Sequence, residues 1–187
     1  MKIAIFASGN GSNAVKIIEH FKDKSQYQFV VLSNKKDVPV LEKAQKLKIE
    51  TYTFGRKDFY ETENVLDFLK EQKTDFVVLA GFLWLIPENL IKLYPNKIIN
   101  LHPALLPKYG GKGMFGSRVH EAVIEAKEQE SGITIHYVNE KYDDGQVIFQ
   151  AKCKVTQEDT PESLAQKIHQ LEHLYLPEIV EKLVKNW

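Results

Sequence analysis

The sequence predicts an α/β fold, in which a doubly wound and mostly parallel sheet carries helices on both faces. The chain has 187 residues, a length typical of one domain. In its first half, short runs of Val, Ile, Leu and Phe alternate with segments whose apolar residues recur at helical spacing. Strands that are apolar throughout are typical of a parallel sheet covered on both faces.

Residues 1–101 are expected to form strands separated by helices. After the first strand, Ala14, Ile17, Ile18 and Phe21 fall on one helical face. The expected strands are Lys2–Ala7, Phe29–Leu32, Ile49–Tyr52, Phe76–Ala80 and Lys97–Leu101. Of the later helices, one begins at Pro39, one spans Asp58–Gln72 and a short one begins at Pro87.

The pattern changes after residue 101. Leu105–Gly116 is rich in Pro and Gly and predicts a loop, and a helix is expected over Arg118–Ala126. Two alternating strands, Gly132–Val138 and Val147–Val155, flank the turn signal Asp143-Asp144-Gly145 and predict a hairpin. Thr160 and Pro161 should begin a last helix, which Pro177 should bend or divide. We therefore expect a single domain over 1–187, with halves at 1–100 and 101–187.

Composition excludes several classes of protein. The 25 basic and 25 acidic side chains give a net charge of zero, which excludes a general electrostatic attraction to nucleic acid or an anionic membrane. The longest apolar run, Phe76–Ile86, is far shorter than the ~20 residues that a membrane helix needs. The single cysteine, Cys153, points to a reducing compartment. These features favour a cytoplasmic protein that acts on small molecules.

Ser8–Asn13 lies between the first strand and the first helix. Backbone N–H groups and the positive end of a helix meet at such a junction, so it is a candidate anion site. The alternative is a tight turn capped by Ser12 or Asn13. Gly9, Gly11 and Ala14 also match a dinucleotide fingerprint, but Asn34 and Lys35 follow the second strand, with no early acidic group to bind a ribose.

Asn100 and His102 stand at the end of an expected strand and share one face of it. An amide donor beside an imidazole suits a reaction in which an oxyanion develops. The alternative is a capping Asn beside a histidine of the core. Thr134 and His136 likewise share a strand face, and His136 is either a pocket residue or a core histidine.

The last helix carries the motif H-x-x-E-H at His169, Glu172 and His173. Two histidines at i and i+4 can bind zinc, with the glutamate as base. A peptidase site needs a third ligand well downstream, and the sequence ends at Trp187, so we expect no metal. These polar residues more simply flank a pocket.

Six stretches together resemble the glycinamide ribonucleotide formyltransferases of purine synthesis. They are Ser8–Asn13, Leu79–Phe82, Asn100–Tyr109, Gly132–His136, Asp143–Gly145 and Gln170–His173. The resemblance covers essentially the whole chain. It implies a Rossmann-like formyltransferase fold and transfer of the formyl group of 10-formyltetrahydrofolate, the cosubstrate, to the glycyl amine of the ribonucleotide.

The resemblance also implies roles for individual residues. Asn100, His102 and Asp143 would be catalytic, and His136 and Thr134 would support them. The sets implied for the ribonucleotide are Gly11, Ser12, Asn13, Glu172 and His169, and those for the folate are Lys57, Leu83, Trp84, Leu85, Ile86, Asn100, Glu140 and Asp144. Arg56 is the alternative to Lys57 at the folate tail, and the Gly110–Gly116 loop is either a flap or a solvent loop.

Other readings compete with this one. Another formyltransferase or a hydrolase that uses 10-formyltetrahydrofolate would share the same signature. An NADP-binding module that uses Lys35 and Lys36 is the alternative without folate. In every case the expected partners are small molecules, with no nucleic acid or membrane, and the chain is a monomer or a homodimer.

Overall fold

The computed structural model describes residues 1–186, so Trp187, the last residue of the predicted domain, lies outside the described residues. Its seven strands have the order β3-β2-β1-β4-β5-β6-β7. β1 pairs in parallel with β2 and β4, and β2 pairs in parallel with β3. The predicted α/β fold with a mostly parallel sheet is confirmed. Contacts within the chain define two compact units, Met1–Ile99 and the residues from Asn100 onward.

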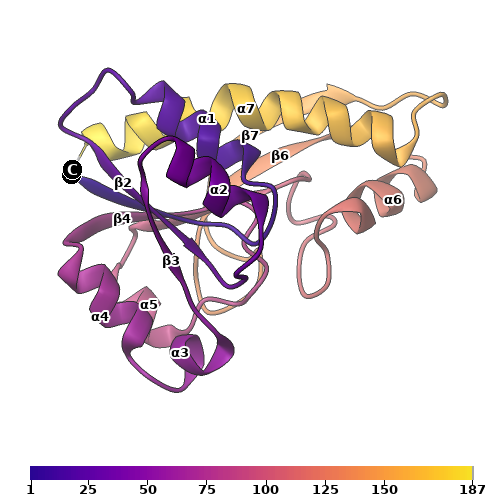
Figure 1. Cartoon of the computed structure of the whole chain (residues 1–187). Coiled ribbons are helices and arrows are strands. Elements are labelled where there is room, and N and C mark those ends of the chain that lie inside the picture. The colour runs from indigo at the N-terminus through magenta and orange to yellow at the C-terminus, as the bar shows by residue number, and fades with distance from the viewer. Residues whose placement is uncertain (187) are drawn as a thin grey trace. The chain divides into compact units, whose positions relative to one another are not determined.

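The first unit alternates strands and helices (Figure 1). Its elements are β1 (Lys2–Phe6), α1 (Ser12–His20), β2 (Gln28–Ser33), α2 (Pro39–Lys46), β3 (Glu50–Thr53), α3 (Arg56–Tyr60), α4 (Asn64–Glu71), β4 (Thr74–Leu79), α5 (Glu88–Leu93) and the start of β5 (Ile98–His102). Within this unit α1 and α2 lie on one face of the sheet and α3, α4 and α5 on the other (Figure 1). Because both faces are covered, the central strands β1, β2 and β4 are almost wholly buried.

The helix expected over Asp58–Gln72 is wrong, because the structure has two helices there, α3 and α4. Asp58 accepts hydrogen bonds from Gly55 N at 2.9 Å and from Asn64 Nδ2 at 2.8 Å. The Thr62 hydroxyl donates to the Asp58 carbonyl at 3.4 Å and accepts from Asn64 N, also at 3.4 Å. Polar side chains thus satisfy backbone groups at the break between the helices.

The second unit continues β5 and adds a hairpin and two helices. Its remaining elements are α6 (Ser117–Glu125), β6 (Glu130–Tyr137), β7 (Val147–Lys154) and α7 (Pro161–Lys185). β6 and β7 pair antiparallel, as predicted, and the register shifts between Ile135 and His136. α7 packs against β6, β7 and α6. The irregularity in the ladder therefore lies next to His136, where it re-aims the strand.

α7 begins as the sequence predicts, since Ser163 N donates to Thr160 Oγ1 at 3.2 Å and Thr160 N to Ser163 Oγ at 3.0 Å. Pro177 does not divide this helix. Buried residues such as Leu164 and Val184 lie on both sides of the proline, so packing holds the two parts in one helix. Among the described residues, no helix is long and apolar enough to cross a membrane.

Candidate active site

Three polar side chains that the sequence singles out meet in the second unit, and His136 joins them. Asn100 and His102 come from the end of β5, His136 from β6, and Asp143 from the loop between β6 and β7. His102 and His136 are only 3% and 2% exposed, so their ring nitrogens need partners within the protein. Asp143 lies between the other three.

Asp143 is held by contacts to both carboxylate oxygens. Oδ1 accepts from Asn100 Nδ2 at 3.2 Å and lies 3.6 Å from His136 Nε2. Oδ2 accepts from Gly111 N at 2.9 Å and lies 3.5 Å from His102 Nδ1. Burial raises the pKa of this carboxyl. The hydrogen bond from His136, the charge of His102 and the Gly111 N–H outweigh burial, so the pKa lies below its usual value.

His102 is held from two sides. Its Nε2 lies 2.7 Å from the carbonyl oxygen of Tyr109, so this nitrogen carries the proton that the carbonyl accepts. Burial is the largest influence on the pKa of His102 and lowers it. Asp143 and the Tyr109 carbonyl oppose burial only in part, so the net pKa is lowered. Asp143 thus favours the protonated ring, but in the free protein desolvation outweighs it.

Asn100 and His136 bond to each other. Asn100 Nδ2 lies 3.1 Å from His136 Nε2, and His136 Nδ1 lies 2.8 Å from the carbonyl oxygen of Tyr137. His136 Nε2 thus faces both the Asn100 amide and, at 3.6 Å, Asp143 Oδ1. The Asn100 amide nitrogen therefore contacts both His136 and Asp143.

The segment that follows His102 is fixed by Thr134, which is fully buried. Thr134 Oγ1 donates to the Ala104 carbonyl at 2.6 Å and accepts from Leu106 N at 3.0 Å. Gln150 Nε2 donates to Thr134 Oγ1 at 2.9 Å and to the Leu106 carbonyl at 3.0 Å. These hydrogen bonds fix Ala104 and Leu106, which precede Tyr109, the residue whose carbonyl contacts His102.

The other two acidic candidates of the β6–β7 loop lie at the surface. Asp144 accepts from Asn139 Nδ2 at 3.2 Å and is 3.8 Å from Lys141 Nζ. Glu140 is exposed. Asp143 differs because its φ of 52° turns it away from the direction of its neighbours.

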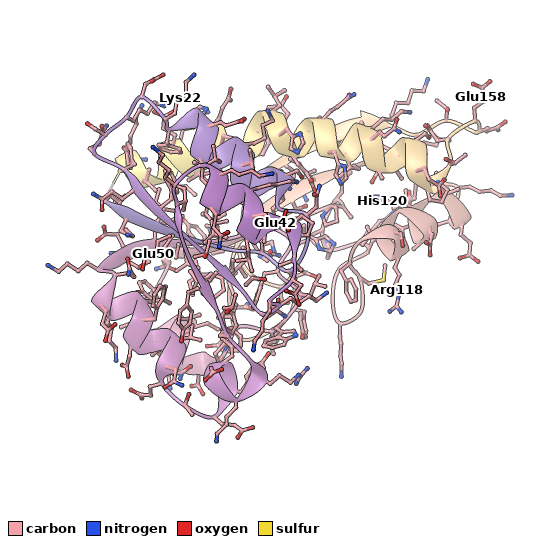
Figure 2. All side chains as sticks on the ribbon, viewed as in Figure 1. Lys22, Glu42, Glu50, Arg118, His120 and Glu158 are labelled. Carbon is pink, nitrogen blue, oxygen red and sulfur yellow. The ribbon has the colours of Figure 1, made fainter. Side chains whose placement is uncertain are left out.

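Three histidines and Glu172 gather where α6 and α7 pack. Glu172 is 6% exposed, and the rings of His169 and His173 stack with centroids 6.3 Å apart. His120, which sequence reasoning missed, lies on the side of α6 that faces α7 (Figure 2). Burial lowers the pKa of His120, and the charges of His169 and His102 lower it further. Among residues 1–186, no group of three or more His, Cys, Asp or Glu side chains is arranged to hold a metal.

In the first unit, the Ser8–Asn13 segment, hereafter the glycine loop, connects β1 to α1. Gly11 caps the helix with a φ of 72°. Ser8 N donates to the Gly81 carbonyl at 3.0 Å, and Ser8 Oγ accepts from Leu83 N at 3.1 Å. The candidate phosphate segment and the candidate folate segment Leu83–Ile86 are therefore directly bonded at the carboxyl ends of β1 and β4, where open α/β sheets bind ligands.

An arginine lies over the aromatic rings beside the candidate folate segment. The Arg56 guanidinium is 5.2 Å from the centre of the Trp84 ring and 5.8 Å from that of Tyr60. Tyr60 donates its hydroxyl to the Leu85 carbonyl at 2.9 Å. Lys57 is exposed on the same short helix. Of the two basic candidates, Arg56 is the one in contact with the folate segment.

The lowered pKa values of His102 and His120 predict a stability that depends on pH. In the unfolded chain these imidazoles take up protons near pH 6.5, whereas the folded protein resists protonation of both. The free energy of unfolding should be constant above about pH 7.5 and fall below pH 6.5, with a limiting slope of about 1.4 kcal/mol per pH unit for each histidine.

Urea unfolding between pH 8 and pH 5.5 measures this slope. His120→Leu should make the curve shallower by removing one of the two groups. A wild-type curve that stays flat down to pH 5.5 contradicts the prediction.

The chain matches a family model and several known proteins. A family model described as "Formyl transferase" matches residues 1–180. The chain is 43% identical over 186 residues to the phosphoribosylglycinamide formyltransferase, chloroplastic, of Arabidopsis thaliana, covering 96% of this chain. It is 32% identical over 189 residues to the phosphoribosylglycinamide formyltransferase of Bacillus subtilis, covering 98% of this chain and 94% of that protein. The chain spans only 64% of the length of the Arabidopsis relative and 61% of that from Vigna unguiculata.

Solved structures agree with these matches. The phosphoribosylglycinamide formyltransferase from Bacillus halodurans is 34% identical, with a TM-score of 0.87 over 98% of this chain and 95% of that one. The one from Streptococcus pneumoniae is 36% identical, with a TM-score of 0.86 over 98% of both chains. Because the family model matches nearly the whole length of this chain, the chain belongs to the formyl transferase family.

Proposed function

We propose that the protein transfers the formyl group of 10-formyltetrahydrofolate to the glycyl amine of phosphoribosylglycinamide in purine biosynthesis. The observation that carries the proposal is the contact of Asn100, His102 and Asp143 at the end of β5. The printed names of the relatives support this substrate pair. The products are formylglycinamide ribonucleotide and tetrahydrofolate.

The reaction forms one C–N bond and breaks another. The amine attacks the formyl carbon, and negative charge develops on the formyl oxygen. The bond from that carbon to N10 of the folate then breaks, and the proton lost by the amine ends on N10. Asp143, ionised because its pKa is lowered, orders the water that relays this proton.

Asn100 and His102 stabilise the charge on the formyl oxygen. In the free protein His102 Nε2 is occupied by the Tyr109 carbonyl, and the Asn100 amide by His136 and Asp143. We infer that the formyl oxygen replaces the Tyr109 carbonyl and takes one amide hydrogen. Each such donor contributes about 3 kcal/mol to transition-state stabilisation. His102 must gain a proton as substrates bind, since burial keeps it neutral beforehand.

The ribonucleotide phosphate is assigned to the backbone of Gly11, Ser12 and Asn13. The positive end of α1 and the loop N–H groups favour an anion there. Glu172 is assigned to the ribose hydroxyls and His169 to the phosphate.

The folate is assigned to Leu83–Ile86, Asn100, Glu140 and Asp144, with the pterin ring bound largely through backbone groups. Trp84 and Arg56 form the basic and aromatic surface for the folate tail, with Lys57 as the second cation. The carbonyl of Leu85 is already fixed by Tyr60.

The proposal includes the setting of the reaction. All partners are small molecules, and the mechanism needs no metal because proton relay and hydrogen bonding account for each step. We place the enzyme in the cytoplasm, since its only cysteine, Cys153, is half-buried and unpaired. It acts as a monomer or a homodimer.

Loss of 10-formyltetrahydrofolate, followed by absorbance, tests the function. We expect turnover only when phosphoribosylglycinamide is present, and His102→Ala should reduce it at least about 100-fold. Turnover without the ribonucleotide would indicate a hydrolase. Absence of turnover in both mixtures would overturn the proposal, and sugar nucleotides would be the next acceptors to try.

A further inference from the structure

Lys43 of α2 binds the glycine loop. Its Nζ lies 2.9 Å from the carbonyl oxygen of Asn10 and 2.6 Å from Asn10 Oδ1. On the same helix, Val40 N donates to the carbonyl of Gly9 at 3.2 Å. Two consecutive carbonyls of the loop are therefore held by α2.

Holding these carbonyls also fixes the N–H groups that follow them. In a planar trans peptide, the C=O and the next N–H point in opposite directions. With the carbonyls of Gly9 and Asn10 turned toward α2, the N–H groups of Asn10 and Gly11 point away from it. Among the described residues, neither N–H donates to a backbone acceptor. The bonds to α2 thus present two donors on the side opposite to that helix.

The charge of Lys43 is not neutralised by a carboxylate. Both of its hydrogen bonds go to Asn10, and within residues 1–186 its ammonium forms no ion pair. Lys43 is half-buried, which weakens screening by water. A net positive charge therefore remains against the glycine loop, where it favours an anion.

α2 packs so closely against the glycine loop that Gly11 has no space for a side chain. A Cβ placed on Gly11 would lie 2.2 Å from Val40 Cγ2 and 2.9 Å from Val40 Cα. Since one of these atoms belongs to the backbone, a rotamer change cannot relieve the contact. The loop keeps its shape through this packing together with the Lys43 bonds.

We propose that Lys43 is a positioning residue for the phosphate group of the ribonucleotide, acting through the Asn10 carbonyl and through its uncompensated charge. This inference rests on the proposed function, which assigns the phosphate to the glycine loop. Lys43 touches the loop and not the reacting atoms, so it should affect ribonucleotide binding and leave the chemical step unchanged.

Four variants separate the effect of the Lys43 charge from that of its hydrogen bonds to Asn10. Lys43→Met removes both, Lys43→Gln keeps a donor without charge, and Lys43→Arg keeps both. Lys46→Met, one turn along the same helix and exposed, is the matched control. Two readouts are needed: KM for each substrate, and the backbone amide shifts of Asn10 and Gly11 when ribose 5-phosphate is titrated into the labelled protein.

We expect Lys43→Met to raise KM for the ribonucleotide and Kd for ribose 5-phosphate about 10- to 100-fold, the effect of losing a hydrogen bond to a charged group. Lys43→Gln should fall between Met and wild type, and Lys43→Arg should restore most of the affinity. The kcat and the folate KM should change less than about twofold, as should all constants of Lys46→Met.

An unchanged Kd in Lys43→Met, or an equal loss in Lys46→Met, would overturn the inference. So would a fall in kcat with unchanged KM. The amide shifts make the two proposals distinguishable. If wild type binds ribose 5-phosphate at the loop in a Lys43-dependent way but does not turn over, the proposed function fails and the role of Lys43 stands.

Discussion

Asp143→Asn should lower kcat about 1,000-fold while changing the ribonucleotide KM less than about threefold. The substitution keeps the size of the side chain and its acceptor for Gly111 N, and Asn tolerates the φ of 52° at this position. What it removes is the negative charge that attracts a proton onto His102, 3.5 Å away. It also replaces the Oδ1 acceptor of Asn100 Nδ2 with an NH2 group, so the loss reports the charge together with that hydrogen bond, and single-turnover kinetics at saturating substrate measure it.

The neighbouring residue provides the control for this prediction. Asp144→Asn makes the same chemical change one position along, at an exposed side chain whose ion pair with Lys141 is 3.8 Å long. It should leave kcat within about twofold, because exposed ion pairs contribute little. If Asp143→Asn keeps more than a tenth of the wild-type kcat, Asp143 is not part of the catalytic centre.

The part of the site that lies on a strand could be predicted from the sequence. Residues at i and i+2 share a face, so the spacing of Asn100 and His102 is enough to place them together. Asp143 is different, because two aspartates in a turn are ordinary for backbone reasons. Only the resemblance points to it, and only the backbone geometry shows why it turns inward and Asp144 does not.

The remaining contacts leave little trace in a sequence. His102 is bonded to the carbonyl of Tyr109 and Asp143 to the N–H of Gly111, and backbone groups are the same for every residue type. The direction of the His102 pKa depends on how burial compares with nearby charge, which composition cannot reveal. Gly110–Gly111 does carry one signal, since a Cβ at Gly110 would meet Leu106 Cδ2 at 2.5 Å.

The fold, like the placement of Asn100 and His102, was predictable because regular strands leave a regular pattern in the sequence. Buried parallel strands produce apolar runs that a sequence displays directly, as in β1 and β4. The break between α3 and α4 was missed because the buried residues Phe59, Leu66 and Leu69 keep helical spacing across it, so the apolar pattern runs on without interruption. Side-chain bonds among Asp58, Thr62 and Asn64 end one helix and begin the next there.

Gly11→Ala should lower the free energy of unfolding by about 2–4 kcal/mol, from left-handed backbone strain and overpacking together. The φ of 72° disfavours any Cβ, and this one would meet Val40 at 2.2 Å. Since Val40 and Lys43 lie on one helix, displacing α2 also displaces the ammonium that holds the Asn10 carbonyl. Ribonucleotide affinity should therefore fall at least as far as in Lys43→Met, by about 100-fold or more.

Gly9→Ala separates these effects from the general loss of a glycine in the loop. No heavy atom lies within 4 Å of a Cβ built at Gly9, and its φ is not in the left-handed region. Its free energy of unfolding in urea should stay within about 0.5 kcal/mol of wild type. Equal destabilisation by the two variants would mean that contact with α2 does not shape the loop. A destabilised Gly11→Ala protein that still binds ribose 5-phosphate with wild-type affinity would mean that the loop recognises phosphate without α2, and Lys43 would then have no positioning role.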